Sequence, residues 1–542
     1  MVGARLTAAC LLLVCLLLPL ACGRSGHSDA LARRMQAGVI VYNLANEPTT
    51  LDPARASRLS DLRTVGQLLD GLVRIGPDGR VEPAAATSWT IAPDGRTYTF
   101  RLRQARWSNG DPVRAGDFAF AWRRVLDPAT RGIFANLLFG IEGAEPYFKA
   151  APEARAGIRL GIETPDDRTL VVRLAQPVSY FLSLVALETC FPVHPPTVTR
   201  LGEAAFAAPH YIGNGPFRLV EHIPRRRIVL EPNPLHAEAG AGPQRLIFVM
   251  VENEFTEWTA YRRGELDVTA TVHRSALATV RRRVDFRSVP LVGTCYLVFN
   301  CEQPPFDRAE VRRAFARALD RQLLVQHITR GGEQPATAFV PPGILYPLWR
   351  GDFRREGGDL LPPTAPDDAE MQRLRAAMGA LPGPIDYAFD TSDLMRSLAI
   401  ALQMTWRERL GVEVGIQAQP ARVLAQRKRA GDFQIARASW IADYLDATTF
   451  LDLFRGDSPQ NVTRWRDPRY DALLDRAAAA ADPAARIDLL HEAERLLMDE
   501  MPICPVFFYA IAYLERPGLE GIRRNLLGRV DFRRAHWSAP KE

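Results

Sequence analysis

One carboxylate stands out in the sequence because its neighbours are apolar and aromatic. In the stretch ARASWIADYLDATTFLDLF, residues 436–454, Asp443 follows Ile441 and Ala442 and precedes Tyr444. A carboxylate that is buried without a partner costs several kcal/mol or takes up a proton. Asp443 is therefore either held at the surface or kept inside in order to receive a cation.

Catalytic chemistry finds little support in the rest of the sequence. Asp443 and Asp446 lie three residues apart and could form an acid/base pair, but no nucleophile or metal ligand accompanies them. The chain has no GxSxG elbow, no Walker A sequence, no HExxH motif and no CxxC pair, and its nine His are scattered singly. We therefore predict that the protein is not an enzyme and that it carries no cofactor and no metal.

Length and composition are those of a large globular protein without a nucleic-acid signature. The 542 residues exceed one ordinary domain, so two or three domains are expected. Apolar residues make up 47% of the chain and the formal net charge is only +6. The basic triplets at residues 225–227 and 281–283 are isolated, and no basic face with interleaved aromatic residues accompanies them. We interpret them as solvated ends of strands and helices and expect no nucleic-acid partner.

The N-terminus has the pattern of an export signal. Arg5 precedes a short apolar run that ends in small residues before Cys22, which predicts a signal peptide over residues 1–21. Ala21 and Cys22 resemble a bacterial lipobox, although Pro19 stands where Leu is usual. We therefore expect a lipid on Cys22, a tether over residues 22–37 and a membrane-anchored protein outside the cytoplasm, in the periplasm or at the cell surface.

Four further cysteines remain in the predicted mature chain: Cys190, Cys295, Cys301 and Cys504. Cys295 and Cys301 lie in TCYLVFNC, which alternates like a strand. Six residues of strand span about 20 Å, so these two thiols cannot bridge each other without a bend. We interpret all four as free thiols that are mostly buried.

Strands and hairpins dominate the N-terminal half, whereas helices alternate with strands in the C-terminal half. A buried strand follows Gly38, two Asp-Gly turns at residues 78–79 and 94–95 predict hairpins, and residues 97–102 alternate as a strand. Beyond about residue 292, a helix with Asp307 as its N-cap covers residues 307–328, and a long helix ends at Gly411. This alternation predicts an α/β lobe, and the absence of a low-complexity linker predicts interleaved domains.

Residues 84–118 resemble the signature of the family 5 solute-binding proteins of ABC transporters. The matching positions are Ala86, Trp89, Asp94, Gly95, Tyr98, Phe100, Leu102, Arg103, Trp107, Gly110, Pro112, Val113, Ala115 and Asp117. The order of TLDP, GNGPFRL, YRRGELDV, FDRAEVRRAFARALDR, TSDLMRSLAIA and ARASWIADY along the chain also resembles that of the family. The resemblance therefore extends over essentially the whole predicted mature chain.

The resemblance implies a fold of the type II periplasmic binding protein class. Such a fold is an α/β clamp with two lobes built from three interleaved domains with mixed sheets. The implied boundaries are residues 38–69, 193–292 and 511–542 for domain I, 70–192 for domain II and 293–510 for domain III. The two lobes would close on a ligand by a hinge, with crossings near Leu291–Thr294 and Tyr509–Ala512.

The stretch around Asp443 looks most like the oligopeptide-binding branch of the family, which implies a set of ligand contacts. Asp443 would anchor the α-ammonium group of a peptide, and strand addition would hold the peptide backbone. The two implied edges are Ser57, Arg58 and Leu59 on one side and Ser439, Trp440 and Ile441 on the other. Trp440 would also wall a side-chain pocket or else belong to the core. Arg437 belongs to the same motif.

The other implied positions depart from the family pattern. A family His and a family Arg near the peptide C-terminus align with Met395 and Lys428, and a pocket Trp aligns near Ala421. A disulfide of the family aligns with Gly293 and Ile441, so that bridge is absent.

The resemblance implies a monomeric, lipid-anchored receptor that delivers oligopeptides to an ABC permease. Dipeptides, murein peptides or another family 5 ligand remain alternatives, as does a peptide sensor or chaperone on the same scaffold.

Overall fold

The computed structural model describes residues 30–346 and 351–538. The predicted signal peptide and the predicted lipidation site at Cys22 lie outside these residues. Within them, no helix is both long enough and apolar enough to cross a membrane.

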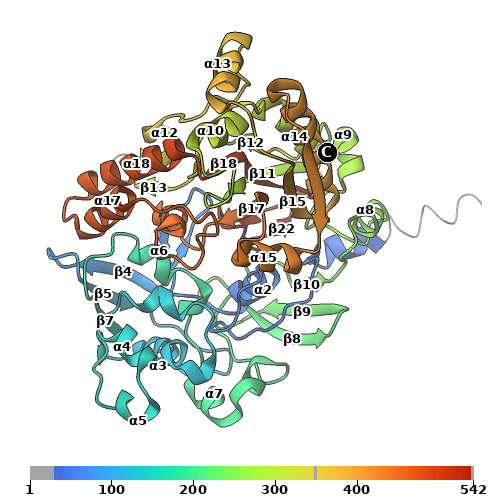
Figure 1. Ribbon diagram of the computed structural model, residues 1–542. Helices are drawn as coiled ribbons and strands as arrows, with labels where there is room; N and C mark the ends of the chain where they lie inside the picture. Colours follow the sequence, from blue (N-terminus) through green and yellow to red (C-terminus); the bar gives the residue numbers. More distant parts are fainter. Residues whose placement is uncertain (1–29, 347–350, 539–542) are drawn as a thin grey trace, which may run out of the picture.

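Three sheets organise the described chain (Figure 1). The first sheet mixes parallel and antiparallel pairs in the order β1 (Val39–Asn43), β10 (Arg245–Val249), β9 (Arg227–Pro232) and β8 (Phe217–Ile223). The second is antiparallel, in the order β4 (Ala86–Ile91), β5 (Thr97–Leu102), β7 (Thr169–Arg173) and β6 (Ile162–Asp166). The third, also mixed, runs β12 (Gln334–Pro335), β18 (Ile503–Leu514), β11 (Phe286–Phe299), β17 (Ile435–Ile441), β15 (Ile385–Asp390) and β16 (Val414–Gln419). The α/β class with mixed sheets is therefore confirmed.

Short strand pairs and helices complete the fold. The short pairs are β2 (Val73–Ile75) with β3 (Val81–Pro83), β13 (Leu345–Tyr346) with β14 (Gly351–Asp352), β19 (Leu519–Glu520) with β22 (His536–Trp537), and β20 (Arg523–Arg524) with β21 (Val530–Asp531). Helices that precede β11 are α2 (Leu59–Leu68), α3 (Ala115–Leu126), α4 (Ala144–Lys149), α5 (Pro152–Arg155), α6 (Phe181–Val185), α7 (Pro195–Leu201), α8 (Glu254–Arg262) and α9 (Arg274–Val280). Helices that follow β11 are α10 (Ala309–Arg317), α11 (Arg321–Leu324), α12 (Phe353–Gly357), α13 (Asp368–Met378), α14 (Asp393–Leu410), α15 (Ala421–Ala430), α16 (Thr448–Leu451), α17 (Pro468–Ala479) and α18 (Pro483–Glu500).

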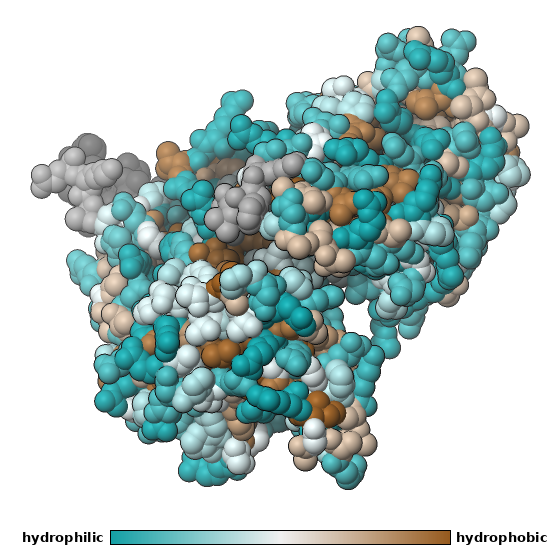
Figure 2. All heavy atoms as spheres, turned by 90° about the vertical axis from the view of Figure 1, so that its left-hand side faces the viewer, coloured by the Kyte–Doolittle hydropathy of each residue, from teal (hydrophilic) through white to brown (hydrophobic). Residues whose placement is uncertain are grey.

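Two long strands, β11 and β18, join the first and third sheets. Their antiparallel ladder covers both strands but shifts register between Pro290 and Thr294, within a predicted crossing. Just beyond β18, Glu515 forms a bridge with Val268, which also pairs with Tyr42 of β1. In the space-filling view a notch separates an upper from a lower mass (Figure 2).

Local sequence signals explain most of these elements. β5 alternates because Tyr98, Phe100 and Leu102 point into the core. α14 begins after Ser392, whose hydroxyl accepts the backbone N–H of Met395, and ends at Gly411 in the left-handed conformation. These bounds agree with the sequence predictions.

The predicted helix over residues 307–328 is interrupted. α10 has Arg308, rather than Asp307, at its N-cap, and no side chain caps it. A new helix, α11, begins after Asp320, whose carboxylate accepts the backbone N–H of Leu323. The Asp320 cap stabilises the break between α10 and α11. The spacing of apolar residues continues across this break and therefore does not reveal it.

The four cysteines are free thiols, as predicted. Cys190, Cys295 and Cys504 are buried and Cys301 is half-buried. Gly293 and Ile441, which align with the family disulfide, lie opposite each other on β11 and β17.

Candidate functional site

Asp443 lies just beyond the end of a central strand of the third sheet. β17 pairs with β11 up to Gly293↔Ile441, and the N–H of Ala442 then donates to the carbonyl oxygen of Val292 at 2.8 Å. The N–H of Asp443 donates to Thr449 Oγ1 at 3.3 Å. The sheet therefore fixes the backbone on which the Asp443 side chain stands.

A buried ion pair holds the loop after Asp443. The Arg486 guanidinium donates to both carboxylate oxygens of Asp446, at 3.0 and 2.8 Å, and the Tyr346 hydroxyl donates at 2.9 Å. Although burial acts to raise the pKa of Asp446, the Arg486 charge holds it below its usual value. Tyr444 stacks on Tyr180 with ring centroids 4.8 Å apart. Asp446 is thus a structural counter-ion and not an acid/base partner of Asp443.

The Asp443 carboxylate is the one charge of this loop that is left available. Its side chain is half-buried, and among the described residues no side chain forms an ion pair or hydrogen bond with it. Burial raises the pKa of Asp443, while the more distant Arg529 charge acts to lower it. A cation placed beside Asp443 would favour the ionised carboxylate and offset this increase in pKa.

A cavity of about 240 Å³ opens beside Asp443. Its walls come from distant segments: Ser57, Leu59, Leu62, Phe134, Leu137, Leu187, Glu188, Thr189, Leu291, Ile441, Ala442, Asp443, Leu527 and Arg529. Most of these side chains are apolar. The cavity therefore combines an acceptor for a cation with a surface suited to an apolar group.

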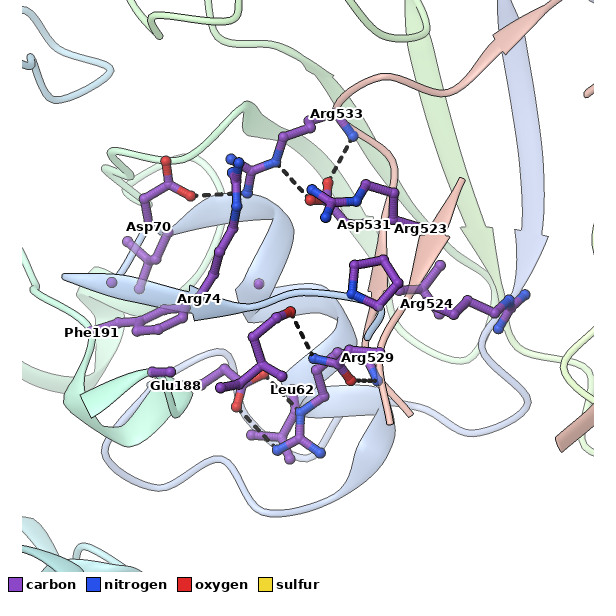
Figure 3. A pocket seen from close by; sticks show the side chains of 18 residues that line it. Leu62, Asp70, Arg74, Glu188, Phe191, Arg523, Arg524, Arg529, Asp531 and Arg533 are labelled. Carbon is purple, nitrogen blue, oxygen red and sulfur yellow. Dashed lines mark hydrogen bonds and ion pairs between the residues drawn. The ribbon is translucent and has the colours of Figure 1, made fainter. Parts of the chain in front are cut away.

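The charged groups on the opposite wall satisfy each other. Arg529 Nε and Nη2 donate to the two carboxylate oxygens of Glu188 at 2.9 and 3.1 Å, and Nη1 donates to the carbonyl oxygen of Leu527. Figure 3 shows this pair from a smaller adjoining cavity of about 80 Å³, in which Asp70 is likewise paired with Arg533. Arg529 therefore places positive charge near Asp443 without neutralising it.

The second half of β17 has an open edge. β15 pairs with β17 only at Tyr387↔Ile435 and Ala388↔Ala436, and no described strand pairs with residues 437–441 on that side. Lys428 Nζ donates to the carbonyl oxygen of Arg437 at 3.2 Å, so this carbonyl faces away from β11. Because orientation alternates along a strand, Ser439 and Ile441 also direct their backbone N–H and C=O groups to the open edge.

The other predicted edge is not a strand. Leu59 opens α2, and the Asp61 carboxylate accepts the N–H groups of Ser57 and Arg58 at 3.2 and 3.1 Å. These two groups are therefore occupied by a helix-terminal carboxylate. Ser57 and Leu59 still line the cavity beside Asp443, whereas Arg58 does not.

None of Arg437, Lys428 and Met395 lines the cavity beside Asp443, and Lys428 contacts the backbone of Arg437. Arg437 forms an ion pair with Asp390 at 3.2 Å and donates to the Tyr509 hydroxyl at 2.6 Å. Burial lowers the pKa of Lys428 to about 8, with Arg437 acting in the same direction. Met395 is buried. Arg437 and Lys428 form a positively charged region toward the other end of the open edge.

Trp440 belongs chiefly to the packing. It is half-buried against the core, its indole N–H donates to Thr449 Oγ1 at 3.4 Å, and it does not line the cavity.

The residues with the strongest sequence signature also stabilise the fold. Trp107 is buried and donates to Asp117, which in turn accepts the N–H of Arg114 at the start of α3.

Several cavity residues were not predicted from the sequence. Phe134, Leu137, Glu188, Leu527 and Arg529 carry no motif, and only the tertiary structure brings them to Asp443. No described group of three His, Cys, Asp or Glu residues is placed to hold a metal ion.

Comparison with known proteins gives consistent matches. A sequence model described as "Bacterial extracellular solute-binding proteins, family 5 Middle" matches residues 80–462. The "Dipeptide-binding protein DppE" of Bacillus subtilis is 34% identical over 519 residues, 94% of each chain. The "Probable deoxycholate-binding periplasmic protein YgiS" of Escherichia coli is 32% identical, over 89% of this chain and 90% of that protein.

The solved structures agree with the sequence matches. Haemophilus influenzae OppA, in its complex with RPPGFSPFR, superposes with a TM-score of 0.72 at 29% identity, over 93% of this chain and 99% of that chain. Such coverage shows that the described residues form the same fold, that of the type II periplasmic binding proteins.

Proposed function

The chain belongs to family 5 of the bacterial extracellular solute-binding proteins, and we propose that it captures short peptides outside the cytoplasm and delivers them to an ABC permease. One observation carries this proposal. Asp443 is a half-buried carboxylate without a partner among the described residues, and it stands at the end of an open sheet edge. A free peptide supplies a cation and an extended backbone together.

The geometry suggests one orientation of the peptide. Its ammonium group would pair with Asp443, and its backbone would add to Ser439 and Ile441 along the open edge. A peptide in this position would run antiparallel to β17, toward Arg437 and Lys428. The Ser57 to Leu59 segment would contribute cavity walls rather than a regular strand, because Asp61 holds two of its N–H groups.

Dipeptides are a second candidate, favoured by the name of the Bacillus relative. A dipeptide would reach Asp443 but would leave most of the open edge unpaired. A bile acid such as deoxycholate fits less well, because it carries a carboxylate and no ammonium group for Asp443. A receptor that senses peptides without transport would use the same site.

Export and anchoring form part of the proposal. Members of this family act outside the cytoplasm, and the predicted signal peptide agrees with that location. We propose that Cys22 carries the lipid anchor and that the protein works as a monomer beside its permease.

Mass spectrometry of the molecules that copurify with the protein tests the ligand class directly. Peptides with free N-termini should dominate the spectra of material released by denaturation. A ligand without an amine, such as a bile acid, would contradict the assignment of Asp443.

Removal of the peptide C-terminal charge should weaken binding in a pH-dependent way. Lys428 has a pKa of about 8, so it is protonated below that pH and becomes neutral above it. A peptide acid should therefore bind roughly tenfold better than its amide at pH values well below 8, and the advantage should fall as the pH rises through 8. Calorimetry of free and amidated pentapeptides across this range measures the ratio of their dissociation constants. The N-terminal amine is the same in both peptides, so its own titration cancels in this ratio.

Two variants test whether Lys428 causes the preference for the peptide acid. Lys428→Ala should abolish the advantage of the acid, whereas Arg429→Ala, a change of the exposed neighbour on α15, should preserve it. Equal affinities for acid and amide in the unmodified protein would mean that the C-terminus is not recognised here.

The apolar cavity should favour peptides whose first residue is apolar. Burial of a Leu side chain among Leu137, Leu187 and Leu291 is worth about 1.5–3 kcal/mol relative to leaving it exposed, so a Leu-first tripeptide should bind at least about tenfold better than its Gly-first counterpart. Leu137→Ser should reduce this preference, and Val220→Ser, at an exposed position on β8, should not. Calorimetry with the two peptides gives the preference, and equal affinities would show that the cavity does not receive this side chain.

A further inference from the structure

A basic surface lies next to the N-terminal helix of the described chain, residues 30–36, and shares no residue with the cavity beside Asp443. Five exposed arginines form it, and we name them the arginine face: Arg262, Arg263, Arg281, Arg282 and Arg330. None of the five forms an ion pair within the described part of the chain. The carboxylates of Asp285 and Asp267 are engaged by Arg283 and Arg34. The acids that remain nearby are the exposed Glu252, Glu254, Glu265 and Asp393 and the half-buried Glu333.

Contacts between helices make this surface continuous. The guanidinium carbons of Arg262 and Arg283 lie 5.7 and 6.0 Å from the ring centroid of Trp258, so the ends of α8 and α9 meet there. A groove of about 590 Å³ continues from α9 to the segment after α11, lined by Ala278, Arg281, Arg282, Gln326, His327 and Arg330. The Arg274 side chain donates to the carbonyl oxygen of Ile328 and ties the two walls together.

Apolar side chains protrude from the same surface. Val284 is 78% exposed and Phe255 is 61% exposed, the two highest values among the exposed large apolar residues of the described chain. Val284 follows the basic triplet directly, and Phe255 lies in the first turn of α8. Cations with protruding apolar groups suit the headgroup region of a bilayer, where charge meets phosphate and apolar groups enter the acyl boundary.

The N-terminal helix places this surface close to the proposed anchor. Residues 30–36 are helical, and Arg34 donates to the carbonyl oxygen of Gly264 and to Asp267, immediately after Arg263 (Figure 1). Ala30 is the eighth residue after Cys22, so the two Cα atoms can lie at most about 29 Å apart. A lipid on Cys22 would therefore keep this side of the protein near the membrane.

We infer that the arginine face binds the anionic phospholipid surface of the membrane that carries the protein. The orientation of the protein on the membrane rests on the proposed lipid anchor at Cys22. The affinity of the arginine face for anionic lipid does not depend on that anchor. The groove of the arginine face and the cavity beside Asp443 share no lining residue. The residues that would contact lipid are therefore not those that would hold the peptide.

Vesicle cosedimentation of the mature chain with Cys22→Ser tests the inference without an acyl chain. We expect binding to vesicles of phosphatidylcholine with about 30% phosphatidylglycerol to be at least about tenfold stronger than to phosphatidylcholine alone, and to be lost at high salt. Arg281→Gln/Arg282→Gln should weaken binding about fivefold or more. The matched control, Arg225→Gln/Arg226→Gln in the other exposed triplet, should change it less than about twofold.

Each alternative result has a definite meaning. Equal binding to both kinds of vesicle, no binding to either, or an equal loss in the control pair would overturn the inference. Peptide calorimetry on Arg281→Gln/Arg282→Gln should be unchanged, which separates a failure of this inference from a failure of the proposed function. A further variant, Val284→Ser, should reduce vesicle binding without altering the salt dependence.

Discussion

Asp443→Asn is expected to remove most of the affinity for peptides. The substitution keeps the size of the side chain but removes the charge that would receive the ammonium group. Loss of one partner of a desolvated pair costs about 3–5 kcal/mol, so the dissociation constant should rise by roughly two to three and a half orders of magnitude. Calorimetry with tripeptides to pentapeptides measures the change, and an unchanged affinity would contradict the role of Asp443.

The same variant should not harm the ligand-free protein. Burial raises the pKa of Asp443 in the folded state, so the ionised carboxylate opposes folding at neutral pH and this cost disappears as the pH falls through the raised pKa. Asn removes the charge, and the unfolding midpoint at pH 7 should stay equal or rise. Asp457→Asn, a change of an exposed carboxylate, is the matched control and should alter neither stability nor affinity.

Arg486→Gln is expected to cause the largest loss of stability. It leaves the Asp446 carboxylate buried without its counter-ion, which costs about 3–5 kcal/mol of unfolding free energy. The loop that carries Asp443 should loosen as well, so peptide affinity should fall together with stability. Urea denaturation at pH 7 measures the first effect.

Double substitution and pH test the reason for this loss. Asp446→Asn/Arg486→Gln should recover part of the stability, because no buried charge is left unpaired. The folded-state pKa of Asp446 is lowered, so the pair stabilises the protein above the unfolded value of about 4 and loses its effect as the pH falls below it. Lys149→Gln, which breaks an exposed pair with Glu145, should cost less than about 0.5 kcal/mol. An Arg486 variant as stable as this control would refute the structural role of the pair.

The sequence predicted correctly those helices, strands and turns whose ends depend only on residues close by in the chain. The alternation of Thr97–Leu102, the Asp-Gly turns and the stop at Gly411 each act within a few residues, and the structure has these bounds. The helix over residues 307–328 was predicted too long, since Asp320 caps a second helix inside an apolar pattern that looks continuous.

The candidate site was only partly predictable, for the same physical reason. Asp443 is visible in the sequence because a carboxylate among apolar residues conflicts with ordinary burial. The cavity walls are not, because Leu137, Glu188 and Arg529 meet Asp443 only in the folded chain. The segment from Ser57 to Leu59 was predicted to offer a free edge, but Asp61 in the first turn of α2 accepts two of its N–H groups.

The central claim is that the free amine of a peptide is held by Asp443, and one comparison tests it most directly. Calorimetry of a pentapeptide and its N-acetylated form with the unmodified protein changes the ligand alone, by the one group that Asp443 would receive. The peptide should bind, and acetylation should weaken binding by at least about a hundredfold, because the carboxylate would then face a neutral amide. Equal affinity for the two forms would contradict the account.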